Sequence, residues 1–429
     1  MATFAIQNFG CRASQADGAA LESQLLERGF APADRPEFVI LNTCTVTATA
    51  DDEIRQVVRR VHRENPDARI VVTGCYAQRA PNEIAALPGV AMVVGNSHKT
   101  HLAGLLAEPS APFHGEIHVG DIFAEHEFLA SPVADPAGDR SRPNLKIQDG
   151  CNNRCSFCII PFVRGRSRSA PADQVIEQIR TLSANFSEVV LTGINLGRWG
   201  REPGSNVRLA GLLRRILAET ELRLIRLSSV EPMDFSDDLL GLIAESPRIA
   251  KHVHAPLQSG SDTVLRRMHR KYRPSHYEDR IRRARAWMPD AAIGADVMVG
   301  FPGETEAEFE ETRAFIESLP FSYLHIFPYS ERPGTPAAER TDQVPVEARR
   351  HRGRVLKTLA LAKNLEFRQR MVGKHLQAVT LEDRISAVTS NYLRVQLAAP
   401  RTPRDMSEVE IGGLTPNGLA ERAALQILA

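Results

Sequence analysis

The chain has 429 residues, of which 43% are hydrophobic and 24% charged, a balance typical of a globular protein long enough for two or three domains. Its formal net charge is +1, so no overall field steers it toward an acidic partner, and a nucleic acid would have to bind a local basic patch. No stretch approaches the roughly 20 apolar residues of a membrane span, and residues 1–10 lack signal-peptide features, so we expect a cytoplasmic protein without membrane contact.

Residues 1–107 alternate short apolar runs with helical patterns, and we assign them to a first domain. Such alternation predicts a parallel sheet whose strands end along one edge. Strands are predicted at 3–9, 38–41, 70–72 and 90–94, and helices at 14–28, with Ser14 as the N-cap, and at 51–64.

A cysteine follows each of the first three strands, at Cys11, Cys44 and Cys75, which we call the first cysteine trio. Neighbouring strands lie about 4.8 Å apart, so three adjacent strand ends span roughly 10 Å, the scale of one metal cluster. Singly, each cysteine would more often be a small buried hydrophobic residue. Three at the same topological position, in a reducing cytosol, predict a joint metal site rather than disulfides.

Residues 108–142 are rich in Pro, Ala, Asp and Gly and are predicted to be a linker, with residues 115–123 as the one candidate strand. Residues 143–365 form a second domain of repeated βα units. Repeated units predict a parallel sheet or partial (β/α) barrel with its chemistry at the carboxyl ends of the strands, and hence an α/β fold. Strands are predicted at 144–148, 188–191, 224–227, 252–255, 295–299 and 323–327, and a helix at 173–182.

Polar or glycine-bearing segments directly follow these strands. Any one of them is compatible with a helix cap or a turn, but several on one face of a barrel define a pocket. The segments are residues 192–195, 226–232, 254–261, 296–304 and 327–335.

Residues 346–370 predict a helix with eight Lys or Arg against two Glu. A basic helical face is usually only solvated, but beside a catalytic barrel it is also a credible phosphate-contacting surface. Residues 366–429 are assigned to a third domain, a small β-barrel, with strands at 376–381, 385–389, 392–397 and 409–411. From residue 371 onward six basic and six acidic side chains cancel, so strong electrostatic attraction to RNA is not expected there.

The densest cysteine group is the second cysteine trio, Cys151, Cys155 and Cys158, with the spacing C-x3-C-x2-C. Iron–sulfur clusters usually take four thiolates, so three leave one iron open. An open coordination position is where a substrate or cofactor binds. The alternative is a zinc site completed by a distant histidine, although zinc sites favour paired C-x2-C units.

The spacing C-x3-C-x-aromatic-C, with Phe157 as the aromatic residue, resembles the signature of the radical S-adenosylmethionine (SAM) enzymes. The resemblance implies a 4Fe–4S cluster on the second trio, with SAM on the fourth iron. It also implies that an electron from the cluster cleaves SAM to methionine and a 5'-deoxyadenosyl radical, which abstracts hydrogen from C–H bonds. The SAM-contacting residues that it implies are Phe157, Thr192, Glu231, Gln258 and Ser259.

Three arginines, Arg164, Arg166 and Arg168, closely follow the second trio. We weigh two interpretations equally: that they pair with an anionic substrate or the SAM carboxylate, or that they are merely exposed to solvent.

Nearly the whole chain resembles the methylthiotransferases, on residues 42–44, 74–75, 150–165 and 256–260. That family combines a three-cysteine domain, a radical SAM barrel and a small β-barrel of the TRAM type, and carries two 4Fe–4S clusters. The resemblance implies an auxiliary cluster on the first trio that holds the sulfur to be inserted. It implies replacement of C–H by C–SCH3, with SAM as methyl donor and radical source, an electron donor of the flavodoxin or ferredoxin type, and a sulfur donor.

Residues 42–47, 74–78, 149–153 and 228–232 look most like the enzymes that methylthiolate N6-threonylcarbamoyladenosine at position 37 of tRNA. Two alternatives within the family are isopentenyladenosine at the same position and an aspartate of ribosomal protein S12. A third, of another class, is a non-catalytic metal-dependent RNA-binding protein in which both trios are structural. The tail, including residues 406–413, fits the TRAM pattern loosely, which leaves the mode of RNA docking open.

Overall fold

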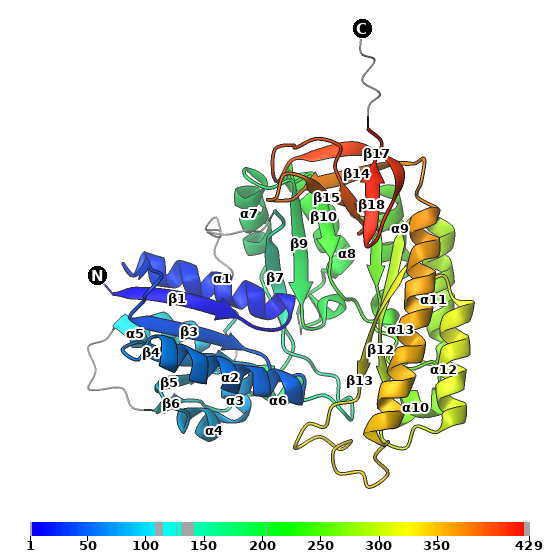
Figure 1. The fold of residues 1–429 in the computed structure, drawn as a ribbon. Helices are drawn as coiled ribbons and strands as arrows, with labels where there is room; N and C mark the ends of the chain where they lie inside the picture. The colour runs from blue at the N-terminus through cyan, green and yellow to red at the C-terminus, as the bar shows by residue number, and fades with distance from the viewer. Residues whose placement is uncertain (1, 108–114, 126, 130–140, 203, 424–429) are drawn as a thin grey trace.

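The computed structural model describes residues 2–107, 115–125, 127–129, 141–202 and 204–423. The N-terminal sheet lies beside a larger curved layer of strands and outer helices, and a small C-terminal barrel covers one end of that layer (Figure 1). The α/β fold predicted from the sequence is confirmed, with its three parts in the predicted order. The domain boundaries at residues 107, 142 and 365 stay predictions.

The N-terminal sheet is parallel throughout, with the strand order β2-β1-β3-β4-β5-β6. Every residue of the central strand β3 is buried, as its run of apolar side chains predicts for a strand covered on both faces. The strands are β1 (Thr3–Asn8), β2 (Ala31–Pro32), β3 (Phe38–Thr43), β4 (Arg69–Gly74), β5 (Val90–Gly95) and β6 (Glu116–His118).

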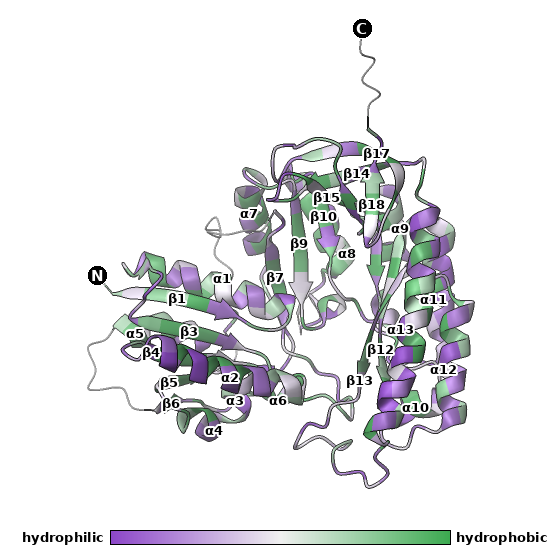
Figure 2. Ribbon diagram, in the orientation of Figure 1, coloured by the Kyte–Doolittle hydropathy of each residue, from purple (hydrophilic) through white to green (hydrophobic). Residues whose placement is uncertain are grey.

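Helices cover both faces of this sheet and enclose two separate cores. Apolar side chains of α1 and α5 pack on one face, and those of α2, α3 and α4 pack on the other. In Figure 2 the outward side of α2 is hydrophilic while the strands behind it are hydrophobic. The helices are α1 (Arg12–Glu27), α2 (Ala48–Glu64), α3 (Cys75–Arg79), α4 (Pro81–Ala85), η1 (Lys99–His101) and α5 (Leu102–Ala107).

Two predicted helix starts were wrong. α1 begins at Arg12 rather than Ser14, because Cys11 takes the N-cap position, and it does so without a side-chain cap. α2 begins at Ala48 because the side chain of Thr47 accepts a hydrogen bond from the Ala50 N–H, which caps the helix three residues earlier than predicted. The candidate strand within residues 115–123 exists as β6 and extends the N-terminal sheet beside β5.

The central layer consists of two sheets, β10-β9-β7-β8 and β11-β12-β13. All neighbours are parallel except β7 and β8, and one parallel bridge between Ile225 and Ile249 continues the curve from β10 toward β11. The arrangement is the predicted partial barrel. Its strands are β7 (Asn144–Asp149), β8 (Arg168–Ser169), β9 (Glu188–Gly193), β10 (Leu224–Leu227), β11 (His252–His254), β12 (Ala292–Val299) and β13 (Tyr323–Pro328).

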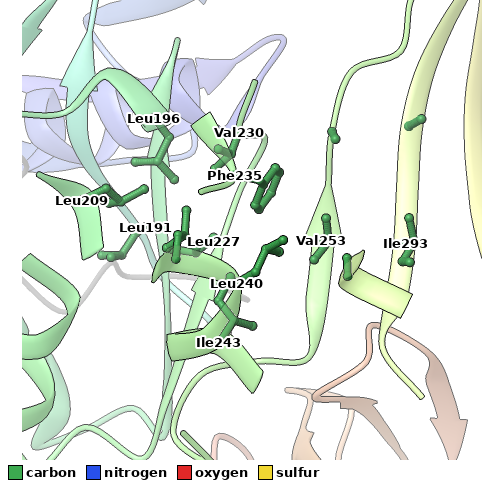
Figure 3. Close-up of a cluster of buried hydrophobic side chains, with 14 of the residues drawn as sticks. Leu191, Leu196, Leu209, Leu227, Val230, Phe235, Leu240, Ile243, Val253 and Ile293 are labelled. Atoms are coloured by element: carbon green, nitrogen blue, oxygen red, sulfur yellow. The ribbon is translucent and has the colours of Figure 1, made fainter. Parts of the chain in front are cut away.

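Outer helices close the hydrophobic core of this layer, part of which Figure 3 shows between β9, β10, α8 and α9. Thr305 and Glu308 form a reciprocal capping box that starts α12. The helices are α6 (Ile160–Arg164), α7 (Ala172–Ser183), η2 (Leu196–Arg198), α8 (Leu209–Glu219), η3 (Pro232–Asp234), α9 (Asp237–Glu245), α10 (Asp262–Arg267), α11 (Pro274–Trp287), α12 (Glu306–Ser318) and α13 (Val346–Gln369).

The C-terminal strands form a closed barrel in the order β14-β15-β16-β18-β17. Four of its strands were predicted, and the fifth, β18, was missed. Among the described residues, no helix has the length and apolarity needed to cross a membrane. The strands are β14 (His375–Thr380), β15 (Ser386–Thr389), β16 (Arg394–Gln396), β17 (Met406–Thr415) and β18 (Gly418–Glu421).

Candidate active site

The first cysteine trio lies at one edge of the N-terminal sheet. β1, β3 and β4 are direct neighbours, with Asn8 paired to Asn42 and Thr43 to Gly74. Cys44 directly follows β3, Cys75 directly follows β4, and Cys11 lies three residues beyond β1. The prediction that these three thiols gather at adjacent strand ends is therefore confirmed by the sheet topology.

Two glycines allow the turns that carry these cysteines to pack closely against one another. Gly10 has φ +96°, and a Cβ added there would lie 2.5 Å from Cys44 Cβ and 2.9 Å from Cys44 Sγ. Gly74 has φ +100°, and an added Cβ would lie 2.4 Å from the Thr43 carbonyl oxygen. Both positions therefore need glycine for the backbone conformation and for the close approach.

Burial and mutual proximity act on the thiols of the first trio. Cys44 and Cys75 are buried, whereas Cys11 is exposed. Burial, followed by the neighbouring Cys75 and Cys11, raises the pKa of Cys44 to about 12. Three thiolates are therefore unfavourable here unless a cation neutralises them.

The second trio lies on the loop between β7 and α6. Cys151 Sγ accepts hydrogen bonds from the Asn153 N–H at 3.4 Å and from Asn195 Nδ2 at 3.8 Å. Burial, followed by the nearby Cys155, raises the pKa of Cys158 to about 12. All six cysteines are free thiols.

Helix α6 brings the two trios together. Cys75 of the N-terminal part packs in one apolar cluster with Ile159 and Val163, which closely follow Cys158 along the chain. Arg164, at the end of α6, donates from Nε to Cys75 Sγ at 3.3 Å. The loops that carry the two trios are therefore in direct contact through this short helix.

The solvent-exposed interpretation of the arginines after the second trio was wrong for Arg164. Its side chain is 2% exposed and pairs with Asp149 and Asp17, at 3.0 Å each, instead of facing solvent. Arg168 is half-buried and donates to the carbonyl oxygens of Glu127 and Arg164. Arg166 is exposed, as the second interpretation expected.

A buried ionic network joins α1 to β7 beside the cysteines. The carboxylate of Asp17 pairs with Lys99 at 3.1 Å, with Arg164, and with Lys146, which also pairs with Asp149 at 2.9 Å. Burial alone would raise the pKa of Asp17, but the cations of Lys146, Lys99 and Arg164 bring it well below its usual range. The network fixes the two domains against each other next to both trios.

The geometry bears directly on the zinc alternative. Sulfurs around one zinc ion, at about 2.3 Å from it, would lie roughly 4 Å apart. Within the described parts of the chain, the one group of three His, Cys, Asp or Glu side chains whose ligand atoms all lie within 4.8 Å of one another is His254, Asp296 and His325. The three sulfur atoms of neither trio all lie that close to one another, so neither trio forms a ready-made three-ligand zinc site in this structure.

The predicted SAM-contacting residues lie at or beyond the carboxyl ends of the strands. Thr192 is buried in β9, and Phe157 packs edge-to-face on Phe301. Glu231 follows β10 and accepts a hydrogen bond from Arg270. The hydroxyl of Ser259 is buried and forms a hydrogen bond with Thr312 Oγ1 at 3.0 Å, and its contact with SAM stays a prediction.

The side chain of Gln258 is one of several buried polar groups with an atom that has no hydrogen-bond partner among the described residues. Its side-chain Oε1, Ser228 Oγ and Asn195 Oδ1 are all unpaired, and they follow β11, β10 and β9 respectively. A buried polar atom without a partner is costly, so three of them at the same end of the barrel indicate that a polar ligand completes their hydrogen bonding. These residues fit a ligand such as SAM.

Sequence reasoning missed Arg270. Its side chain is buried, and it donates to Cys155 Sγ at 3.3 Å and to Glu231. Sequence reasoning placed His254 and Asp296 in the predicted pocket segments but missed their grouping with His325. On the neighbouring strands β11, β12 and β13, Asp296 accepts from His325 and pairs with His254, both at about 3 Å. The contacts of Arg270 and of His325 join residues that are far apart in the chain, so the sequence carries no local signal of them.

Comparison with known proteins gives the same division of the chain. A model of the radical SAM superfamily matches residues 145–316, and a model described as uncharacterized protein family UPF0004 matches residues 3–95. The methyltransferase TsrM from Kitasatospora setae, a radical SAM protein of known structure, aligns with a TM-score of 0.58 over 78% of this chain and 73% of its own, at 16% identity. At that identity the likeness concerns the fold.

Two curated relatives match almost end to end. The threonylcarbamoyladenosine tRNA methylthiotransferase MtaB of Aquifex aeolicus is 38% identical over 396 residues, which are 91% of this chain and 96% of the relative. The protein of the same name from Bacillus subtilis is 40% identical over 414 residues, or 92% of this chain and 90% of the relative.

The barrel, the three-cysteine loop and the matching superfamily model define a radical SAM protein, a class that uses SAM and a 4Fe–4S cluster. Within that class, the chain belongs to the methylthiotransferase family of these curated relatives.

Proposed function

We propose that this protein methylthiolates tRNA, converting N6-threonylcarbamoyladenosine at position 37 to its 2-methylthio derivative. The observation that carries the proposal is the packing of Cys75, from the first trio, against Ile159 and Arg164 of the segment that directly follows Cys158 of the second trio. A reaction that needs both a radical source and a sulfur source requires two such centres side by side. The names of the two curated relatives support the choice of substrate.

In this proposal the second trio holds the SAM-binding 4Fe–4S cluster and the first trio holds a second cluster. When bound, these groups supply the electron that cleaves SAM and the sulfur that is inserted. Phe157, Thr192, Glu231 and Gln258 are the proposed SAM contacts, and the unpaired Oε1 of Gln258 supports its assignment.

Residues of the chain itself hold the start of α1 against the barrel. Arg12 of α1 donates to Asn144 of β7 at 3.2 Å, and Asn144 donates in turn to Gln15 at 3.1 Å. These bonds fix the segment next to Cys11 to β7.

The proposal includes a flavodoxin- or ferredoxin-type electron donor, a sulfur donor and a cytoplasmic location. Each follows from the chemistry, because the reaction consumes electrons and sulfur, and because tRNA is the substrate.

The experiment that tests the substrate is nucleoside analysis of tRNA from a strain that lacks this gene, with and without a plasmid copy. The expected result is loss of 2-methylthio-threonylcarbamoyladenosine in the deletion strain, with threonylcarbamoyladenosine accumulating, and restoration by the plasmid. Normal levels of the methylthio derivative, together with loss of the modification on isopentenyladenosine or on S12, would refute the substrate assignment.

A pair of cysteine variants tests the division of labour between the trios. Cys155→Ala is expected to abolish release of 5'-deoxyadenosine from SAM by the reduced, reconstituted protein. Cys44→Ala is expected to retain that release but to form no methylthiolated product. Equal loss of SAM cleavage in both variants would contradict the separate roles.

A further inference from the structure

Arg164 makes contacts in three directions from a fully buried position. Its Nε donates to Cys75 Sγ at 3.3 Å, one terminal nitrogen donates to Asp149 at 3.0 Å, and the other donates to Asp17 at 3.0 Å and to Ser14 Oγ at 3.2 Å. Because a guanidinium is planar and rigid, satisfying both carboxylates fixes the direction in which Nε points. The hydrogen bond to Cys75 is therefore imposed by the ionic network rather than by chance proximity.

A second donor reinforces the same contact. Asn96, which follows β5, donates from Nδ2 to Cys75 Sγ at 3.6 Å and to the Val163 carbonyl oxygen at 2.7 Å. Cys75 thus receives hydrogen bonds both from Arg164 at the end of α6 and from Asn96, which is itself anchored to α6. The thiol of the first trio is held against a helix that begins two residues after Cys158.

The second trio has a corresponding arginine. Arg270 donates to Cys155 Sγ at 3.3 Å, and Glu231 holds its guanidinium in place. Each trio therefore has one buried arginine that donates to one thiol and is oriented by carboxylates. Two separate sequence segments supply these arginines, so the arrangement is not a by-product of one loop conformation.

A hydrogen bond to a ligand sulfur affects how readily an iron–sulfur cluster accepts an electron. Hydrogen bonds and charge around the sulfur ligands set the reduction potential of an iron–sulfur cluster. Reduction adds negative charge, and a buried cation that donates to a ligand sulfur stabilises that charge more strongly than an exposed one would. Loss of the donor should then make the cluster harder to reduce.

We propose that Arg164 is a positioning residue that raises the reduction potential of a cluster on the first trio and fixes that cluster against the loop of the second trio. The inference rests on the proposed function, because it requires that Cys11, Cys44 and Cys75 hold a cluster. Arg270 has the equivalent effect on the second trio, which makes it a matched control.

The experiment is a redox titration of the reconstituted full-length protein, followed by electron paramagnetic resonance. Two backgrounds separate the clusters: one carries Cys151→Ala, Cys155→Ala and Cys158→Ala, and the other carries Cys11→Ala, Cys44→Ala and Cys75→Ala. Arg164→Lys keeps the charge that Asp17 and Asp149 need but cannot donate in three fixed directions. In the first background it should shift the reduction equilibrium at least tenfold toward the oxidised cluster, about 59 mV for one electron.

The control should separate the two arginines. In the second background, Arg164→Lys should leave the potential unchanged, whereas Arg270→Lys should lower it. Asn96→Ala leaves the buried ions intact. In the first background it should lower the reduction potential of the cluster, by less than Arg164→Lys does. It also tests the inference if the Arg164→Lys protein fails to fold.

The two possible failures are distinguishable. In one outcome, the first-background protein binds iron while Arg164 and Asn96 are unchanged, but neither Arg164→Lys nor Asn96→Ala shifts its reduction potential. The inference about Arg164 is then overturned and the proposed function stands. If the first trio of the wild-type protein binds no iron, the two-cluster proposal is overturned and the inference with it.

Discussion

Asp17 is the residue on which the junction of two domains depends. It lies on α1 of the N-terminal part, and its buried carboxylate pairs with Lys146 and Arg164 of the barrel as well as with Lys99. Removing one partner of a buried ionic group leaves the remaining charges uncompensated, which is more costly than the net value of the pair. Since three cations surround Asp17, its loss should weaken the whole junction.

We predict that Asp17→Asn lowers the free energy of unfolding by about 3–5 kcal/mol at pH 7. The pKa of Asp17 is lowered in the folded state, so its contribution is fully present above the unfolded pKa of about 3.9 and is lost as the pH falls below that value. Between pH 5 and about pH 2 the wild type should therefore lose more stability than the variant does.

Urea unfolding at a series of pH values measures both effects. Asp173→Asn is the control, because Asp173 is 90% exposed and pairs with Arg215 at the surface. Equal stability of Asp17→Asn and wild type at pH 7 would show that the junction does not depend on this carboxylate.

For single residues, the sequence predicts where the cysteines lie better than it predicts which side chains contact them. Cys11, Cys44 and Cys75 were predicted to meet because one βα unit separates each from the next, and parallel strands end at one edge. The burial of Arg164 was not predictable, because its partners Asp17 and Cys75 lie 147 and 89 residues away in the chain. A charged side chain shows its type in the sequence but not its long-range contacts.

Among the elements, the junction of β4 and α3 places Cys75. The chain turns at Gly74 with a positive φ, where other residues are strained, and α3 starts at Cys75 itself. A side chain at Gly74 would press on the backbone of Thr43, directly before Cys44. The geometry of the first trio therefore depends on this glycine.

We predict that Gly74→Ala lowers the amount of iron bound by the first trio by at least half, because the new Cβ displaces the turns at Cys44 and Cys75. The same substitution should lower the free energy of unfolding of the domain by about 1–3 kcal/mol. Iron analysis of reconstituted protein and thermal unfolding provide the measurement. Gly104→Ala, in helix α5 of the same domain, has room for a methyl group and should keep its iron. Full iron content in Gly74→Ala would contradict the close-approach argument.

Helix α13 shows how far an element can be predicted from composition. Its range was predicted to within a residue, but its basic side chains are not one solvated face. Arg352 pairs with Glu304 and Glu306, and Arg368 donates to carbonyl oxygens of the C-terminal barrel. Several charges that composition would assign to solvent or phosphate thus stabilise the fold. Strand β18 was missed because its sequence, Gly-Leu-Ala-Glu, has no β-branched or aromatic residue.

For the molecule as a whole, Arg226 links the central barrel to the C-terminal barrel. Its buried guanidinium pairs with Glu188 at 2.5 Å and donates to the carbonyl oxygens of Thr389 and Ser390 at the end of β15. Arg226 is therefore one of the side chains that join the two barrels, because it satisfies both a carboxylate of one and backbone acceptors of the other.

We predict that Arg226→Met destabilises the protein by about 3–5 kcal/mol, because Glu188 loses its main partner in a buried site. Amide hydrogen exchange should accelerate most in β15 and the turn that follows it, where two carbonyl oxygens lose their donor. Glu188→Gln combined with Arg226→Met should recover part of the stability, since the buried carboxylate that lost its main partner is then neutral. The recovery is only partial because Arg142, 3.5 Å from Glu188, loses its own partner. Unchanged exchange in β15 would mean that other contacts hold the barrels together.

The central claim is that two iron–sulfur clusters occupy the two cysteine trios. Its most direct test is the iron content of anaerobically reconstituted protein, measured in wild type and in the two triple-alanine variants. We expect about eight irons per wild-type chain and about four in each triple-alanine variant. A colourless protein with one zinc per trio, or the same iron content in all three proteins, would contradict it.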